Sequence, residues 1–500
     1  TENAAAMSAA GVPTQARDAL VDALTRLAKE GSEFPKIAIF SLCHDLRDAD
    51  KGVRSVALRA IGMGVNTTEI EPDVLVLLGE ALADVDEGVR SSVAAAIALL
   101  ARRCEIPTEV LVNLGGALGD GDREVRLMAS AALAAAATRQ RIPEVVLDGL
   151  REALADEDKE VRHQVADAML EAAGKEQPPG TATTVLRAAL KDGEKYVRRS
   201  VARAVGKAAS QHEVRKELLD ALGNALEDGD RDVRRSAARA IERAAGRSHL
   251  SDGVVGALAK ALQDEDKKVR SDAAFALGGA AGQRQVSARV VLDVRAALED
   301  IEAHVRAGAV WALAQVANNS EVPAEVIKAL GERLQDSAED VRRYAAGAML
   351  LVAKRSELPR WVIDRLGAAL KDRDHGVRYN AALALGEAAH RREVPSTTIA
   401  ALGEALKDSD ADIRRIAAKS ISKAARNQGI STAVLVALGD ALEDGDAKVR
   451  RNAAKAIAKA AGKSLIPAEV VDALRVALRG GDEDVRRWAA QAVEEIGSVG

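Results

Sequence analysis

One dipeptide, Val-Arg (once Ile-Arg), recurs thirteen times at a constant interval of 36 residues, and this period constrains the fold more than any other feature. Its arginines are Arg54, Arg90, Arg126, Arg162, Arg198, Arg234, Arg270, Arg306, Arg342, Arg378, Arg414, Arg450 and Arg486. An uninterrupted period of this length is typical of a solenoid in which each repeat contacts only its neighbours. Thirteen repeats occupy residues 33–500, and residues 1–32 form a separate lead-in.

Each repeat is predicted to be a helical hairpin. In the last one, apolar residues at helical spacing run from Ile466 to Leu478, and after an acidic turn the pattern resumes from Val485 to Ile496. Eight of the eleven prolines lie 19 residues before the repeat's arginine, where a first-turn proline loses no helical hydrogen bond. The lead-in carries one matching stretch, residues 13–29, which predicts an N-terminal capping helix.

Composition narrows the class of protein further. Aromatic residues make up only 2% of the chain, so the core must consist of Ala, Leu and Val. The 71 Lys and Arg nearly balance the 76 Asp and Glu, and the net charge of -5 argues against capture of nucleic acid or membrane by overall charge. Two cysteines, Cys43 and Cys104, exclude a disulfide scaffold, and no apolar stretch reaches the roughly 20 residues of a membrane span. We expect a soluble, cytoplasmic protein that does not enter membranes.

Repeated acidic residues do not indicate a catalytic or metal site. Nearly every repeat has an acid four residues before the arginine, missing only at Ala338, and a short acid before a helix caps its free N–H groups. The seven histidines occupy different repeat positions, and no HExxH or CxxC spacing occurs. Cys43 and His44 are adjacent and would not face each other on a helix. We expect no catalytic residues, no metal and no cofactor.

Segments such as 226–241, with the sequence LEDGDRDVRRSAARAI, resemble HEAT repeats, and this resemblance covers residues 33–500. It implies an all-α fold, a right-handed superhelical α–α solenoid of thirteen hairpins, with the second helices lining the concave side. It also implies a ladder between repeats, formed by the arginine and by an Asp six residues before it. This Asp is present in twelve repeats and replaced by Gly480 in the last, which we attribute to the lack of a following neighbour.

The second helices differ most at positions +1, +5 and +9 from the ladder arginine, which share one face of the helix. Cations occupy these positions in repeats 5 and 6 (Arg199, Arg203, Lys207, Arg235, Arg239, Arg243) and in repeats 11 and 12 (Arg415, Lys419, Lys423, Arg451, Lys455, Lys459). Between these two basic tracks lie four aromatic residues, Phe275, Trp311, Tyr344 and Tyr379. Together they predict a binding surface for an anionic ligand on the concave side.

The predicted function is a noncatalytic interaction scaffold or sensor module that binds a protein or acidic peptide on its concave face. The alternative is a nucleic-acid-binding solenoid that uses the basic tracks of repeats 5–6 and 11–12 for phosphates. A third interpretation leaves the tracks neutralised by acids from neighbouring elements, with Phe275 and Trp311 packed in the structure.

Overall fold

The computed structural model describes residues 42, 45–64, 72–173, 180–480 and 482–499. The described residues form helices and contain no strand. Contacts divide the chain into two compact units, Thr1–Val254 and Val255–Gly500, and each is described by itself. The predicted capping helix over residues 13–29 lies outside the described residues.

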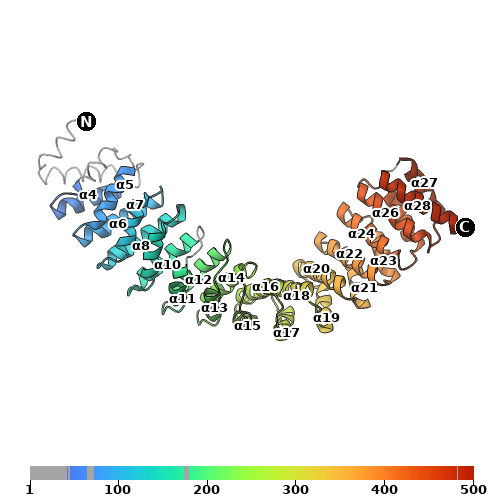
Figure 1. Cartoon of the computed structure of the whole chain (residues 1–500), viewed down its shortest axis with the longest axis horizontal. Helices are drawn as coiled ribbons and strands as arrows, with labels where there is room; N and C mark the ends of the chain where they lie inside the picture. Colours follow the sequence, from blue (N-terminus) through green and yellow to red (C-terminus); the bar gives the residue numbers. More distant parts are fainter. Residues whose placement is uncertain (1–41, 43–44, 65–71, 174–179, 481, 500) are drawn as a thin grey trace. The chain divides into compact units, whose positions relative to one another are not determined.

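Two kinds of helix alternate along the described chain (Figure 1). The first helices of the hairpins are α5 (Pro72–Glu80), α7 (Thr108–Ala117), α9 (Glu144–Ala153), α11 (Gly180–Ala189), α13 (Lys216–Ala225), α15 (Asp252–Ala261), α17 (Ala288–Ala296), α19 (Ala324–Glu332), α21 (Arg360–Ala369), α23 (Ser396–Ala405), α25 (Thr432–Asp440) and α27 (Ala468–Gly480). The second helices are α4 (Lys51–Gly64), α6 (Glu87–Ala101), α8 (Arg123–Arg139), α10 (Lys159–Ala173), α12 (Lys195–Ala209), α14 (Arg231–Ala245), α16 (Lys267–Gln283), α18 (Ala303–Asn319), α20 (Glu339–Arg355), α22 (His375–Arg391), α24 (Ala411–Ala424), α26 (Ala447–Ala461) and α28 (Glu483–Val499). Four first helices, α5, α17, α19 and α25, continue into a short 3-10 helix. These are, in the same order, η1 (Ala81–Ala83), η2 (Ala297–Glu299), η3 (Arg333–Gln335) and η4 (Ala441–Glu443).

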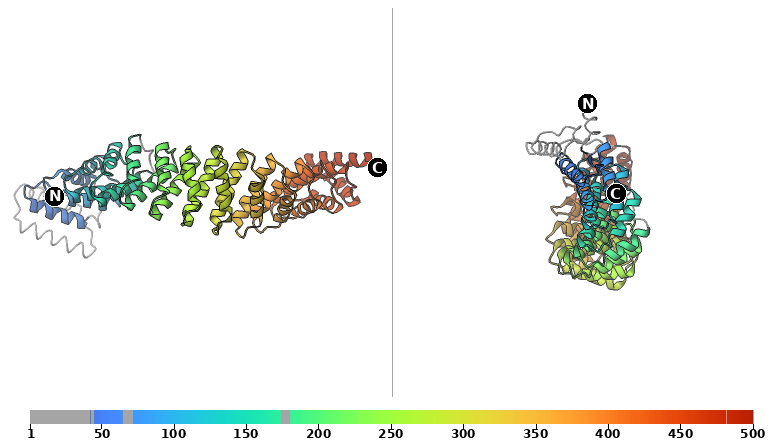
Figure 2. Two further views of the ribbon diagram at one scale, coloured as in Figure 1. Left: turned by 90° about the horizontal axis from the view of Figure 1, so that it is seen from below. Right: turned by 90° about the vertical axis from the view of Figure 1, so that its left-hand side faces the viewer.

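Within each unit, a helix packs against the corresponding helix of the next repeat. In the first unit the second helices contact one another in chain order, from α4 through α6, α8, α10 and α12 to α14. In the second unit the second helices do the same, from α16 through α18, α20, α22, α24 and α26 to α28. The helices lie across the direction in which the repeats follow one another (Figure 2). This sequential packing confirms the predicted α-solenoid, while the number of repeats and the handedness of a superhelix stay predictions.

Small apolar residues make these close contacts possible. In α14, Val233, Ala237, Ala240, Ile241 and Ala244 are all at most 1% exposed, and the same pattern recurs in the other second helices. Because an Ala side chain is small, neighbouring helices approach closely, and the core of each unit is a thin layer between its two rows of helices. This explains how a long chain folds with so few aromatic residues.

The two acids that precede most second helices have separate functions, as the sequence predicts. The acid four residues before the arginine caps the helix: Asp122, for example, accepts hydrogen bonds from the backbone N–H groups of Glu124 and Val125. Equivalent caps are made by Asp86, Asp230, Asp266, Asp374, Asp410 and Asp446. No side-chain cap is made by Glu194 or Glu302 at this position, or by Ala338, where the acid is missing.

The acid six residues before the arginine forms the ladder. Arg90 donates two hydrogen bonds to Asp120 of the next repeat, with distances of 2.7 and 2.8 Å, and a third to the Asp84 carbonyl of its own turn. The same bridge joins Arg54 to Asp84, Arg126 to Asp156, Arg162 to Asp192, Arg198 to Asp228, Arg270 to Asp300, Arg306 to Asp336, Arg342 to Asp372, Arg378 to Asp408 and Arg414 to Asp444. Each pair closes a bidentate contact between neighbouring turns.

Our explanation of Gly480 is wrong in its direction. Each ladder Asp accepts from the arginine of the preceding repeat, so Gly480 removes the partner of Arg450 rather than a contact to a following repeat. Arg450 instead bonds the cap acid Asp482 at 2.6 Å, and the Asp482 side chain is 48% exposed. The ladder therefore ends in its most exposed carboxylate.

Candidate functional site

The six cations predicted in repeats 5 and 6 lie on neighbouring second helices of the first unit. Arg199, Arg203 and Lys207 are on α12, and the other three occupy the same positions on α14. None of the six is buried, because the Ala and Val residues between them face the core. The predicted face is therefore open to ligands on both helices.

A pocket of about 380 Å³ lies among α10, α12 and α14 and brings five of these six cations together. It is lined by Leu170, Glu171, Arg203, Gly206, Lys207, Arg235, Ser236, Arg239, Ala240 and Arg243. Its base is formed where α12 and α14 come close: a Cβ added to Gly206 would lie 3.0 Å from the Cα of Ala240. Glycine at this position thus permits the close approach of the two helices.

The cations of this pocket fall into two groups by their partners. Lys207 pairs with Glu171 at 2.9 Å, and Arg235 lies 3.5 Å from Asp232 on its own helix. Arg203, Arg239 and Arg243 form no ion pair with any described residue and are exposed. The pocket therefore has three guanidinium groups whose hydrogen-bond donors are available to a ligand.

Arg199, the sixth cation, stands outside the pocket. Its guanidinium lies 5.2 Å from the centre of the Tyr196 ring, which Lys195 also approaches at 5.5 Å. Tyr196 is 48% exposed, and our sequence reasoning overlooked it because it precedes the ladder arginine. It adds an accessible aromatic ring beside the cationic face of α12.

The cations predicted in repeats 11 and 12 lie on α24 and α26 of the second unit, and most of them have partners. Lys423 pairs with Glu387 at 2.7 Å, Arg415 with Asp412 at 2.6 Å and Arg451 with Asp484 at 3.5 Å. Burial raises the pKa of Glu387, but the hydrogen bond and charge of Lys423 outweigh it and hold that pKa below its ordinary value.

The three lysines that remain on this face differ from one another. Lys455 lies 5.1 Å above the Trp488 ring, and Lys419 has no partner among the described residues. Burial lowers the pKa of Lys459 to about 8, with further contributions from the charges of Arg426 and Lys455. Three of the six cations on this second face are therefore in ion pairs, compared with two of the six on α12 and α14.

The four predicted aromatic residues do not form a single stack. Phe275 on α16 and Trp311 on α18 contact each other with ring centres 5.8 Å apart, and each ring covers a glycine of the neighbouring helix. A Cβ on Gly278 would lie 2.1 Å from the indole, so Trp311 fills space that only glycine leaves. No ring contact joins this pair to Tyr344, which is 37% exposed, or to Tyr379. These contacts agree with the packing interpretation of Phe275 and Trp311, and ligand binding by the aromatic residues stays a prediction.

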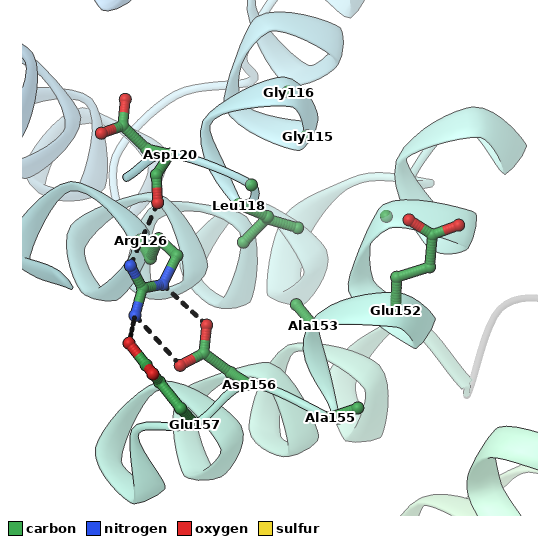
Figure 3. Close-up of a pocket in the computed structure, with 12 residues that line it drawn as sticks. Gly115, Gly116, Leu118, Asp120, Arg126, Glu152, Ala153, Ala155, Asp156 and Glu157 are labelled. Carbon is green, nitrogen blue, oxygen red and sulfur yellow. Dashed lines mark hydrogen bonds and ion pairs between the residues drawn. The ribbon is translucent and has the colours of Figure 1, made fainter. Parts of the chain in front are cut away.

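A larger pocket of about 600 Å³ is lined by residues of α7, of α9 and of the turns that follow them (Figure 3). Glycines 115, 116, 119 and 149 leave it open, and acids line it together with Arg126. Figure 3 shows that this arginine is already bonded to Asp120, Asp156 and Glu157. This pocket is therefore part of the ladder and offers a ligand no free cation.

The described part of the chain contains neither a metal-binding cluster nor a membrane-spanning helix. No group of three or more His, Cys, Asp or Glu in these ranges is placed to hold a metal ion. Among the same residues, no helix combines the length and apolar character needed to cross a membrane.

Comparison with known proteins identifies the family. A family model for HEAT repeats matches residues 182–252, 255–351, 363–438 and 435–500. Among solved structures, an engineered protein is 20% identical, with 85% of this chain and 98% of that chain covered and a TM-score of 0.44. A structure from work on a phosphorylation switch in the interaction between cadherin and beta-catenin is 13% identical, covers 84% and 100% of the two chains, and has a TM-score of 0.48. No curated protein matches the sequence. Because the family model matches more than half of the chain, the protein belongs to the HEAT-repeat family.

Proposed function

We propose that the protein is a noncatalytic binding scaffold that holds an acidic segment of a partner protein along its second helices. HEAT-repeat solenoids commonly serve as scaffolds, since stacked repeats present an extended surface. The observation that carries the proposal is the pocket among α10, α12 and α14, where Arg203, Arg239 and Arg243 lack ion-pair partners in the described structure. Acidic segments are recognised by such arginine clusters.

An arginine that only kept the surface solvated would be expected to have acids beside it, as Lys207 and Lys423 do. Arg239 and Arg243 are instead four residues apart on one helix, where like charges destabilise it by about 0.2–0.5 kcal/mol. Arg203 occupies the same position as Arg239 in the preceding repeat, which adds a third like charge. A bound anion would offset this repulsion.

The surroundings of the pocket favour a short acidic segment over a long polyanion. The equivalent positions on α6 and α8 carry Ser91, Ala95 and Leu99, and then Leu127, Ala131 and Ala135. Affinity for nucleic acid grows with the number of phosphates neutralised, and these positions on α6 and α8 supply no cation for that purpose. A peptide needs only a local cluster of charges.

Binding of labelled peptides tests this proposal. We expect the full chain to bind a pool of peptides rich in Asp and Glu by fluorescence anisotropy, and to bind a neutral pool much more weakly. The double variant Arg203→Glu/Arg239→Glu should abolish the preference. Lys328→Glu is the control, because Lys328 is an exposed cation on the first helix α19, outside both predicted basic tracks, and lacks an ion-pair partner among the described residues.

Oligonucleotides provide the opposing outcome. Single- and double-stranded DNA should be titrated at two salt concentrations with the same variants. Tight DNA binding with a steep salt dependence, lost in the double variant, would replace the protein-binding proposal with nucleic-acid binding. Equal binding of acidic and neutral peptides would also refute it.

A further inference from the structure

We infer that the pocket among α10, α12 and α14 is a site for one phosphorylated serine or threonine within the acidic segment that the protein binds. This inference rests on the proposed function and names the chemistry of its central contact. A phosphorylated side chain carries a charge of about -1.5 to -2 and three strong acceptor oxygens. The pocket presents complementary groups at one place.

The geometry of the pocket brings its three unpaired arginines close together. Arg203 and Arg239 hold the same position on neighbouring helices, and Gly206 lets those helices approach so closely that an added Cβ would lie 3.0 Å from Ala240. Arg243 is one helical turn beyond Arg239 and lines the same pocket. Three guanidinium groups therefore border one cavity, and each provides planar donors that suit phosphate oxygens.

The number of unpaired arginines in the pocket favours a phosphate over a single carboxylate. A single Asp or Glu brings one negative charge and two oxygens, so it would leave part of three guanidinium groups unmatched. A phosphate dianion comes closer to balancing them. The volume of about 380 Å³ is near the lower end of the range for small-ligand sites, which suits one modified side chain.

The wall of the pocket that contains Glu171 and Lys207 determines which side the phosphate would occupy. Glu171 and Lys207 form an ion pair at 2.9 Å, which neutralises this side of the cavity. Glu171 would repel a second negative group placed there, because its carboxylate stays on the wall. The phosphate is thereby directed towards α14, where the unpaired Arg239 and Arg243 lie.

Three peptide pools with the same random acidic flanks and a central Ser, Glu or phosphoserine test this inference on the full chain. At about pH 7.5 we expect the phosphoserine pool to bind at least about ten-fold more tightly than the Ser pool, and several-fold more tightly than the Glu pool. Arg203→Gln/Arg239→Gln should remove this preference, while Lys328→Gln keeps it. Both variants replace exposed, unpaired side chains, and circular dichroism should confirm that they remain folded.

A change of pH separates the phosphate from other charges. The second pKa of a phosphate monoester is about 6, so affinity for the phosphoserine pool should fall towards that of the Glu pool at about pH 5.5. Glu171, Lys207 and the pocket arginines face both pools alike, so the Glu pool controls for titration of the protein itself.

The outcomes are distinguishable. Equal binding of the Ser and phosphoserine pools, with the acidic preference retained, overturns the phosphate site but leaves the proposed function standing. Failure of all acidic pools overturns both. Retention of the phosphoserine preference in Arg203→Gln/Arg239→Gln would overturn the assignment to this pocket. Displacement of the peptides by DNA with higher affinity would overturn the proposed function, and the phosphate site with it.

Discussion

The ladder predicts that one arginine substitution has very different costs at two equivalent positions. Arg126→Ala removes a guanidinium that bonds Asp156 at 2.7 and 3.2 Å and the Asp120 carbonyl at 3.0 Å (Figure 3). The Arg126 and Asp156 side chains are only 9% and 8% exposed. Arg450→Ala removes the same atoms at the same repeat position, but its partner Asp482 is 48% exposed.

These exposed fractions determine how much stability each substitution is expected to cost. Breaking a buried ion pair by removing one partner costs about 3–5 kcal/mol, because the other charge stays buried without compensation. Asp156 keeps the backbone hydrogen bond from Asp158, and a small part of its surface reaches water, so we expect about 3 kcal/mol for Arg126→Ala. An exposed pair is worth at most about 1 kcal/mol, which is the expectation for Arg450→Ala.

Hydrogen exchange measured by mass spectrometry is the suitable assay, since long repeat arrays do not unfold in two states. A loss of about 3 kcal/mol should accelerate exchange in α8 and α10 about 100-fold in Arg126→Ala. In Arg450→Ala, exchange in α26 and α28 should rise less than about six-fold. Similar accelerations in both variants would refute the reasoning that burial decides the strength of each ladder pair.

Three further results are expected. Asp444 has its pKa lowered chiefly by the hydrogen bond from Arg414, so the stability it contributes is present above the ordinary value of 3.8 and is lost as pH falls through the lower folded value. Asp444→Asn should therefore flatten the acid limb of a thermal-unfolding series. Lys459, with a pKa of about 8, should be acetylated faster than other lysines near that pH, as quantified by mass spectrometry. The cost of its charged form is fully present below about pH 8 and is relieved as pH rises from about 8 to the ordinary value of 10.5. Gly278→Ala should lower stability by about 1–3 kcal/mol because its Cβ would meet Trp311 at 2.1 Å, and Trp311→Ala should suppress much of this loss in a double-mutant cycle.

Local features of the repeats were predictable because the same physical requirement recurs in each copy. Pro107, Pro143 and Pro359 directly precede α7, α9 and α21, close to the first turn expected for them. The cap acids could be assigned for the same reason, since capping depends only on residues within one turn of the helix. Because the period is constant, the proline recurs at the same position in eight of the thirteen repeats and the acid at the cap position in twelve.

Contacts between repeats were harder to predict, because they depend on which positions face each other in the stack. The sequence places Lys207 in a basic track, since its own helix carries no acid, and the structure pairs it with Glu171 from the preceding repeat. Both residues lie nine positions after their ladder arginines, and Glu387 and Lys423 repeat the arrangement in the second unit. Aligning the repeats by position, rather than counting charge along each helix, would have revealed both pairs.

The same comparison separates arginines that stabilise this fold from arginines that are available to a ligand. Arg198 and Arg203 lie five residues apart on α12, but Arg198 meets Asp228 in the next repeat at 2.7 Å, whereas the residue facing Arg203 from the next repeat is Arg239. A cation matched by an acid at the facing position is explained by the fold. A cation matched by another cation adds repulsion and calls for an external anion, so the charge of the neighbouring repeat, not that of the whole chain, indicates where this solenoid binds.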